Sequence, residues 1–272
     1  MRHAARARTP CATAPGARPH PVRDHTEVQG PESEHPMPDL SVVIPVFNEV
    51  ESIEPLWGEL REVLESIGRP YEVILVNDGS TDGSEAVVKR LAAEHEPVRY
   101  VSFEANSGQT AAFDAGFKAA RGTLVVTMDA DMQNDPRDIP AMLELIGDYD
   151  VVVGWRHNRK DSAFKRFQAA FARRYRQKRL GDRFHDVGCS LKVYKRECLD
   201  GAKLFGGMHR FLPILLEWDG ARVAEVKVNH RPRTRGRTKY TFFKRMRQAR
   251  QDLRAVVWMK KRRLNYRIKE EG

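Results

Sequence analysis

Three short polar segments, each following a run of small apolar residues, hold the side chains best suited to chemistry. They are Asn48-Glu49, Asn77-Asp78-Gly79-Ser80 and Asp129-Ala130-Asp131. Two carboxylates one residue apart, on a turn that leaves a strand, can direct oxygens to one point, which suits Mg²⁺ or Mn²⁺ shared with a diphosphate. Such carboxylates can also accept hydrogen bonds from ribose hydroxyls or a base N–H. Each segment alone is equally typical of an ordinary turn.

The elements between these segments alternate between short apolar strands and amphipathic helices. We expect strands over residues 40–45, 71–76, 98–103, 124–128 and 150–154, and helices over 50–67, 82–94 and 110–121, with a fourth helix beginning at Asp135-Pro136. Further on, we expect a basic helix over 163–180, a strand near 189–194, a helix within 206–216, a strand over 222–228, a loop over 229–240 and final helices over 241–268. This alternation predicts a parallel sheet covered on both faces. The three segments would then meet at its carboxyl edge, where such folds bind ligands.

Length and composition indicate one globular domain with at most a small annex. The chain has 272 residues, of which 41% are hydrophobic and 31% charged, and its mean hydropathy is −0.58. No apolar run reaches the roughly 18 residues that cross a bilayer. Cys11, Cys189 and Cys198 do not form a disulfide framework, which fits a reducing compartment. We therefore expect a cytoplasmic protein, either free or peripheral on the cytoplasmic face of a membrane.

The first residues differ in composition from the rest. Residues 1–36 are rich in Arg, Pro, Ala and His and bury too little apolar surface to offset the entropy of ordering, so we predict that they are disordered. They lack the apolar core of a signal peptide. Met37, just before the first predicted strand, is an alternative start of translation. The predicted organisation is a disordered extension over 1–36, a catalytic domain over 37–240 and a basic amphipathic helical tail over 241–272.

The net charge of +10 predicts an anionic partner. Basic residues alternate along one extended segment without an acidic residue among them: Arg231, Arg233, Arg235, Arg237 and Lys239. This segment suits phosphate groups, and a solvated basic loop is the alternative. We expect no nucleic-acid partner, because no basic stripe with interleaved aromatic residues is present and the acidic segments would repel phosphates without a metal.

The sequence resembles the family 2 glycosyltransferases of the GT-A fold, in the branch that includes dolichol-phosphate mannose synthase and bacterial polyprenyl-phosphate glycosyltransferases. The resemblance covers about residues 40–240 and is carried by Val43–Glu49 (VIPVFNE), Val76–Asp82 (VNDGSTD), Asn106–Gly108 (NSG), Asp129–Gln133 (DADMQ), Val153–Arg156 (VGWR), His209–Pro213 (HRFLP) and His230–Tyr240 (HRPRTRGRTKY). DADMQ together with the last segment is the most specific part. The resemblance implies a mostly parallel sheet and inverting transfer from a nucleoside-diphosphate sugar to a polyprenyl phosphate. A hydroxyl acceptor in cell-envelope glycan or glycolipid synthesis is the alternative.

The resemblance also implies roles for single residues. The nucleotide-sugar site would comprise Pro45, Asn48, Glu49, Asp78, Ser80, Asn106, Gly108, Asp129, Ala130, Asp131 and Gln133. Asp129, Asp131 and Gln133 would hold Mg²⁺ or Mn²⁺, and the catalytic residues would be Asp131, Arg156, Arg233 and Lys239. Phosphate and acceptor contacts would come from Asp186, Arg210, Arg233, Gly236, Thr238, Lys239 and Tyr240. Leu191-Lys192 stands where relatives more usually have Phe-Arg, which leaves the role of Asp186 open.

The class of acceptor decides whether a catalytic base is required. A polyprenyl phosphate already carries an anionic oxygen near neutral pH, so it needs alignment and screening rather than a strong base. A hydroxyl acceptor would need a base, for which Glu217 and Asp219 are the candidates.

The C-terminal residues predict a basic amphipathic helix, whereas many relatives carry two membrane-spanning helices after the catalytic domain. Its apolar residues fall on one stripe: Phe242, Met246, Ala249, Leu253, Val256, Val257 and Leu264. Such a helix suits an anionic membrane surface. Packing of the stripe on the protein's own core is the alternative, and a membrane-embedded partner subunit is a further one.

Overall fold

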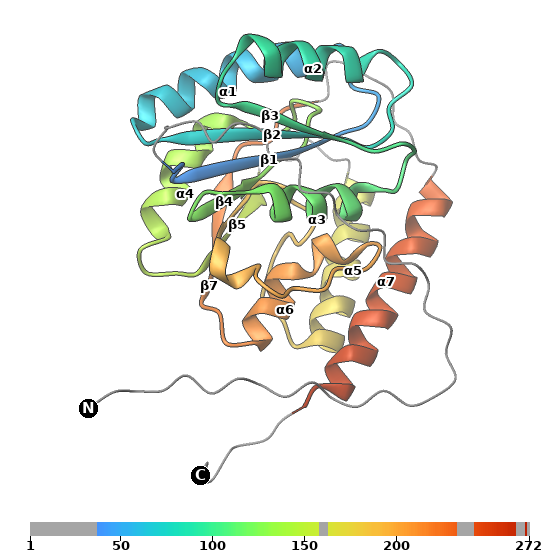
Figure 1. Cartoon of the computed structure of the whole chain (residues 1–272). Coiled ribbons are helices and arrows are strands. Elements are labelled where there is room, and N and C mark those ends of the chain that lie inside the picture. Colours follow the sequence, from blue (N-terminus) through green and yellow to red (C-terminus); the bar gives the residue numbers. More distant parts are fainter. Residues whose placement is uncertain (1–36, 158–162, 233–241, 265–269, 271–272) are drawn as a thin grey trace, which may run out of the picture. The chain divides into compact units, whose positions relative to one another are not determined.

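A seven-stranded sheet with helices on both faces forms the described part of the chain (Figure 1). The computed structural model describes residues 37–157, 163–232, 242–264 and 270, without the side chains of 163–166 and 242–246. The extension predicted over 1–36 lies outside these residues. The strands are β1 (Leu40–Val46), β2 (Tyr71–Asn77), β3 (Val98–Ser102), β4 (Leu124–Thr127), β5 (Val151–Arg156), β6 (Lys192–Lys195) and β7 (Val223–Val228).

The sheet is mostly parallel, which confirms the fold class predicted from the alternation of strands and helices. Its order is β3-β2-β1-β4-β6-β5-β7. β1 pairs in parallel with β2 and β4, β2 with β3, and β5 with β7. β6 alone among the described strands runs antiparallel, between β4 and β5. β1, β2 and β4 are almost wholly buried, as expected of parallel strands covered on both faces.

Helices build a core on each face of the sheet. They are α1 (Ile53–Ile67), α2 (Ser84–Glu94), α3 (Gln109–Ala119), α4 (Ile139–Leu145), α5 (Ala163–Leu180), α6 (Leu212–Trp218) and α7 (Phe242–Arg262), with 3₁₀ turns η1 (Pro136–Asp138), η2 (Arg196–Cys198) and η3 (Met208–Arg210). Residues of α1, α2 and α4 belong to one core, and residues of α3, α6, α7 and the end of α5 belong to the other. Figure 1 shows α1 and α2 on one side of the first strands and α3 on the opposite side.

The small residues of α3 have a packing explanation. A Cβ atom on Gly116 would overlap the side chain of Val43 on β1, so only glycine allows α3 to lie this close to the sheet. This close packing holds the first residues of α3, Gln109 and Thr110, beside the carboxyl edge of the sheet, where β1 and β4 end.

The predicted helix start at Asp135-Pro136 is a 3₁₀ turn followed by α4. The Asp135 carboxylate accepts a hydrogen bond from the backbone N–H of Arg137 at 3.1 Å, and Pro136 occupies the first position of the turn. This is the capping chemistry that the sequence predicts.

The apolar stripe predicted on the last helix packs partly on the protein's own core. Val256 is fully buried, and Leu253 and Val257 pack against the same core. Leu264, by contrast, is 82% exposed, and the side chains of Phe242 and Met246 lie outside the described residues. No helix in the described part of the chain is both long and apolar enough to span a bilayer.

Candidate functional site

The strand register brings the three polar segments to one edge of the sheet, as the sequence predicts. Val46, the last residue of β1, lies opposite Asn77, the last residue of β2. On the other side of β1, Thr127 of β4 pairs with Val43, and the backbone N–H of Met128 donates to the Val43 carbonyl at 3.3 Å. The chain therefore leaves all three strands on the same side of the sheet, where ligands of such folds bind.

Hydrogen bonds fasten the segment after β1 to the segment after β2. The backbone N–H of Asn48 donates to the Ser80 hydroxyl at 3.0 Å, and the N–H of Glu49 donates to the Ser84 hydroxyl at 2.9 Å. Asn48 adopts a left-handed conformation with φ of 51°, which is uncommon outside glycine and is a form of strain often found at functional sites. Pro45, the residue before Val46 on β1, lies opposite Val76 of β2.

Asp78 uses its carboxylate to hold the segment 106–108. Its oxygens accept hydrogen bonds from the backbone N–H of Ser107 at 2.7 Å, from that of Gly108 at 3.0 Å and from the Asn106 side chain at 2.9 Å. Burial raises the pKa of Asp78, and the two backbone donors partly offset that rise. Gly79 has φ of 65°, and a Cβ there would overlap the backbone of Ala105, so the two motifs fit together only with glycine at this position.

The turn after β4 presents Asp129 and Asp131. The Asp129 carboxylate accepts a hydrogen bond from the Gln109 side chain at 2.7 Å, and Asp131 accepts one from the backbone N–H of Gln133 at 3.1 Å. Burial, followed by the charge of Asp131, raises the pKa of Asp129. Ala130, between them, is 4% exposed and packs in the core, so it offers the site only its backbone. Met132 has φ of 61°, which strains the turn.

These residues fit a divalent cation that a substrate helps to coordinate. The two neighbouring carboxylates supply the oxygen ligands that Mg²⁺ and Mn²⁺ prefer, and a cation would offset the charge of Asp131 that helps to raise the pKa of Asp129. Gln133 directs its amide nitrogen to the Arg231 carbonyl at 3.4 Å, which leaves its amide oxygen as the candidate ligand. The described residues contain no cluster of three His, Cys, Asp or Glu side chains suited to a metal, so the remaining ligands would be phosphates or water.

Arg156 and Asp186 form a bidentate ion pair beside this turn. The guanidinium Nε and Nη2 donate to the two carboxylate oxygens at 2.6 and 3.0 Å. Burial works against the charge of Arg156, but the Asp186 carboxylate more than compensates and raises the pKa of Arg156. The structure thus gives Asp186, whose role the sequence left open, a definite partner.

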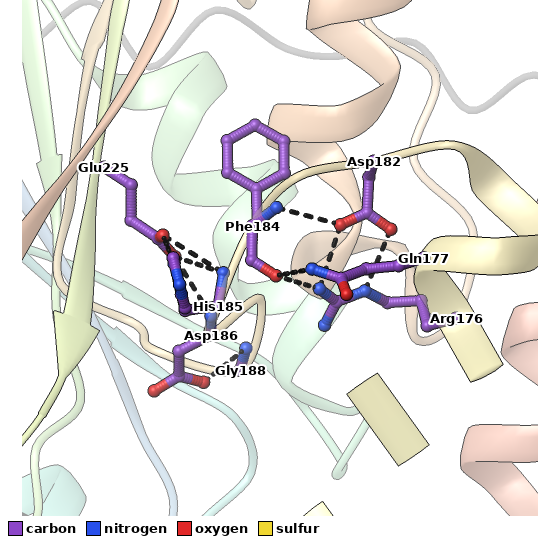
Figure 2. A network of polar contacts seen from close by, with 8 residues as sticks. All are labelled: Arg176, Gln177, Asp182, Phe184, His185, Asp186, Gly188 and Glu225. Atoms are coloured by element: carbon purple, nitrogen blue, oxygen red, sulfur yellow. Dashed lines mark hydrogen bonds and ion pairs between the residues drawn. The ribbon is translucent and has the colours of Figure 1, made fainter. Parts of the chain in front are cut away.

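Polar contacts with Glu225 and with the neighbouring Gly188 fix the position of Asp186 (Figure 2). Glu225 of β7 accepts hydrogen bonds from the backbone N–H groups of His185 and Asp186 at 2.8 and 3.0 Å, and Asp186 itself accepts one from Gly188 at 3.0 Å. Glu225 is not among the residues predicted from the sequence. Its signal is an acidic side chain within an apolar strand, which is an expensive position unless the carboxylate has donors.

The predicted acceptor residue Arg210 lies on η3, next to α7. Burial raises the pKa of Asp252 on α7, and the charge of Arg210 partly offsets that rise. Its neighbour His209 contacts the Thr110 hydroxyl through Nδ1 at 2.7 Å. The other predicted phosphate and acceptor residues, Arg233, Gly236, Thr238, Lys239 and Tyr240, lie outside the described residues.

The basic segment begins directly beside the turn that carries the aspartates. His230 forms an antiparallel bridge with Asn134, and the backbone N–H of Arg231 donates to the Gln133 carbonyl at 3.0 Å. The side chain of Arg231, the first cation of the alternating series, pairs with Asp135 at 2.7 Å and with Glu59 at 2.5 Å. The alternation of basic residues suggests that Arg231 binds phosphate. In the structure, two carboxylates far away in sequence already neutralise its charge.

Comparisons with known proteins agree with this geometry. A family model described as "Glycosyl transferase family 2" matches residues 41–201. A curated relative, dodecaprenyl-phosphate galacturonate synthase of Rhizobium johnstonii, is 41% identical over 208 residues, which cover 74% of this chain and 62% of the relative. The chain thus spans less than two thirds of that relative's length.

Solved structures share the fold at low sequence identity. Glucosyl-3-phosphoglycerate synthase from Mycobacterium tuberculosis, solved with phosphoglyceric acid, has a TM-score of 0.61 at 20% identity, covering 81% of this chain and 80% of that one. Mannosyltransferase PcManGT from Pyrobaculum calidifontis, in complex with GDP-Man and Mn²⁺, has a TM-score of 0.56 at 21% identity, covering 85% of this chain and 66% of that one. The family match covers more than half of the residues and includes the segments after β1, β2 and β4. The chain belongs to glycosyl transferase family 2.

Proposed function

We propose that the chain transfers a sugar from a nucleoside-diphosphate sugar to a polyprenyl phosphate. The observation that carries this proposal is the bridge between Asn134 and His230, because it starts the basic segment beside Asp129 and Asp131. The chain thus passes beside the two carboxylates immediately before residues 233–240, which carry the cations predicted to bind phosphate. The name of the curated relative, a dodecaprenyl-phosphate galacturonate synthase, supports the lipid phosphate as acceptor and a sugar acid as the transferred group.

The proposal includes a divalent cation, Mg²⁺ or Mn²⁺, held by Asp129 and Asp131 with the amide oxygen of Gln133. When bound, this cation would neutralise the charge that develops on the departing diphosphate. Solved relatives of the same fold contain Mn²⁺ together with UDP-glucose or GDP-mannose. The protein's own part is to hold both carboxylates in position, through the Gln109 side chain on one and the Gln133 backbone N–H on the other.

The remaining residues would orient the two substrates. Asp78 fixes the segment 106–108 that borders the donor site. Arg156, held by Asp186, would face the reacting sugar or a phosphate, and Arg233 and Lys239 would bind phosphate oxygens of the acceptor or the diphosphate. Because a phosphate acceptor is already ionised, these groups need to align and screen it, and no side chain has to remove a proton from it.

The structure offers little for the alternative, a hydroxyl acceptor. Its two candidate bases lie at the end of α6. Glu217 pairs with Arg183 at 3.2 Å and Asp219 with Arg263 at 3.8 Å. Both candidate bases are therefore already engaged in ion pairs with arginine side chains. We therefore favour the phosphate acceptor.

A lipid acceptor requires access to a membrane, and we propose that α5 and α7 provide contact with an anionic surface on its cytoplasmic face. Phe167, Phe171 and Tyr175 lie at successive fourth positions of α5 and are 70%, 67% and 48% exposed, and Trp258 of α7 is 62% exposed. Asp252 is the only acidic residue in the sequence of the two helices, which otherwise hold many arginines and lysines. Exposed aromatic side chains among cations suit the boundary of an anionic bilayer. A membrane-embedded partner subunit is the alternative occupant.

The test of the proposed function is a transfer assay with purified full-length chain. It would combine a panel of UDP- and GDP-linked sugars, Mn²⁺ and a short-chain polyprenyl phosphate. We expect one donor to give a lipid-linked sugar that retains the acceptor phosphate, with inversion at the anomeric carbon. Transfer only to hydroxyl acceptors, or hydrolysis of the donor alone, would contradict the proposal.

A further inference from the structure

Lys192 is a buried cation between the two strands that lead to Asp129 and Arg156. It is the first residue of β6, opposite Thr127 of β4 and Val153 of β5. Its side chain is 3% exposed. No described carboxylate forms an ion pair with it, in contrast to Lys195 at the other end of the same strand, which pairs with Asp150 at 2.8 Å.

An ammonium group in this position is costly, because a buried charge without a paired counter-ion loses most of its hydration. Burial lowers the pKa of Lys192 to about 8, and the nearby ionisable groups Cys189, Asp129 and Asp186 partly offset this effect. A lysine with this pKa is still mostly protonated at neutral pH. A hydrophobic residue would fill the same space at less cost, so the charge calls for a function.

His209 supplies a second donor on the same side of the sheet. The Thr110 hydroxyl accepts a hydrogen bond from the Gly207 backbone N–H at 2.9 Å and lies 2.7 Å from Nδ1 of His209, to which it can donate its own hydrogen. Burial, and then Arg210 and Lys192, hold the pKa of His209 well below its usual value, so the ring is neutral. A neutral ring that accepts at Nδ1 carries its hydrogen on Nε2 and is a donor there.

Lys192, His209 and Thr127 are the polar residues of one small, mostly apolar cavity of about 10 Å³, roughly the volume that holds one water, which is otherwise lined by Phe113, Phe117, Tyr194 and Leu212. A cation and a neutral N–H donor at one place match an acceptor-only group, and a carboxylate is such a group. The cavity lies next to β4, whose following turn carries Asp129. The proposed function assigns the phosphates to other cations, Arg233 and Lys239.

We propose that Lys192, with His209 beside it, selects a donor whose sugar carries a carboxylate. A uronic acid has this carboxylate in place of the hydroxymethyl group of a neutral hexose, so the two donors differ only in a group that an ammonium distinguishes well. The inference rests on the proposed function and deepens it by assigning a side chain to the choice of sugar. A phosphate of the donor or acceptor is the other anion of suitable chemistry, and the test separates the two.

The test compares matched donors with wild-type chain and the variant Lys192→Met. UDP-galacturonate with UDP-galactose, and UDP-glucuronate with UDP-glucose, would be assayed with Mn²⁺ and a short polyprenyl phosphate for kcat/KM. We expect wild type to favour one uronate over its neutral partner. Lys192→Met should lower kcat/KM for that uronate by about 30-fold or more and for the neutral donor by less than about threefold, because a charged hydrogen bond is lost only with the former.

Two matched variants control for effects on folding. Lys195→Met makes the same change on the same strand, away from the site, and should leave the preference between donors unchanged. Lys192→Arg keeps the charge and should retain most of the preference for the uronate. Thermal unfolding of Lys192→Met should occur at or above the wild-type temperature, since methionine has similar volume and no buried charge.

The other outcomes are also decisive. Equal losses with both donors would mean that Lys192 serves a phosphate, and unchanged rates would mean that it serves neither; each overturns the inference. A wild-type preference for the neutral sugar would overturn it as well, while transfer to the lipid phosphate still supported the proposed function. If no donor gave lipid-linked product, the proposed function itself would fail.

Discussion

His230 pairs with Asn134 across an isolated antiparallel bridge, which joins the start of the basic segment to the turn that carries Asp129 and Asp131. Asn134 also accepts hydrogen bonds from the backbone N–H of Asp129 at 3.1 Å and from the Ser190 hydroxyl at 2.8 Å. One amide side chain and its backbone thus connect the turn after β4, the chain before β6 and the segment after β7. Polar groups that are central to a buried network of this kind are costly to remove.

We expect Asp131→Asn to reduce sugar transfer by at least about 100-fold, because an amide is a poor ligand for a divalent cation and loses the charge that balances it. Chelation of divalent ions should have the same effect on wild type, and Mn²⁺ or Mg²⁺ should restore it. Asp148→Asn, a change at an exposed position, serves as the control. Full turnover of the Asp131 variant, or of chelated wild type, would remove the metal from the proposal.

The basic segment should divide into a structural and a functional part. Arg231→Ala should lower the free energy of unfolding by about 1–3 kcal/mol, because it leaves Glu59 and Asp135 without their shared partner. Arg233→Ala and Lys239→Ala should change stability little and lower kcat/KM by about tenfold or more. Denaturant unfolding and initial rates measure the two effects. A stable but inactive Arg231 variant would reverse this assignment.

Breaking the pair between Arg156 and Asp186 should affect both stability and turnover. Asp186→Asn and Arg156→Lys each remove the bidentate geometry, and we expect each to cost about 1–3 kcal/mol of unfolding free energy. If Asp186 acts by positioning Arg156, the double variant should be no slower than the single Arg156 variant. Additive losses in a double-mutant cycle would show that the two residues act separately.

The buried charge of Lys192 should make stability depend on pH in a recognisable way. Its pKa in the folded chain, about 8, lies below the ordinary lysine value of 10.5, so the folded state releases this proton first. The folded chain is therefore most stable, as far as Lys192 is concerned, above the unfolded pKa, where the lysine is neutral in both states. This stability is lost as the pH falls through the folded pKa of about 8 and the buried amine becomes charged. Between pH 8 and pH 10, wild type should gain about 2 kcal/mol relative to Lys192→Met. Parallel pH profiles of unfolding would contradict a buried, titrating ammonium.

Substitutions on the aromatic face of α5 should affect vesicle binding, whereas substitutions of the buried apolar residues of α7 should affect stability. Phe167→Ser with Phe171→Ser should weaken flotation with vesicles of phosphatidylglycerol and phosphatidylcholine by about tenfold or more, with little change in the folded structure. Val256→Ala should instead cost about 1–3 kcal/mol of stability and leave vesicle binding unchanged. If vesicle binding were unchanged by the two phenylalanine substitutions and by high salt, this surface would not be the site of membrane contact.

The parallel strands and their helices were predictable because each is short, apolar and bounded by clear turn residues. The meeting of Asn48, Asp78 and Asp129 at one edge followed from that pattern alone. The direction of β6 did not, because alternation of buried residues along a strand is the same whichever way the strand runs. Pairing between distant residues, such as Arg231 with Glu59 or Asp186 with Arg156, was equally hidden. Local sequence carries no information about which opposite charge, far along the chain, will lie within reach.

The reversed strand has a consequence for how this protein could diversify. Because β6 runs antiparallel to its neighbours, its first residue lies beside the last residue of β4, and the chain that leads into it, which includes Asp186 and Ser190, lies at the same edge of the sheet as the turn with Asp129. A wholly parallel sheet would place that incoming chain at the opposite edge, away from substrate. If Lys192 selects the sugar as proposed, substitutions in this short stretch would alter which sugar is accepted while the strands that carry the aspartates keep their sequence and packing.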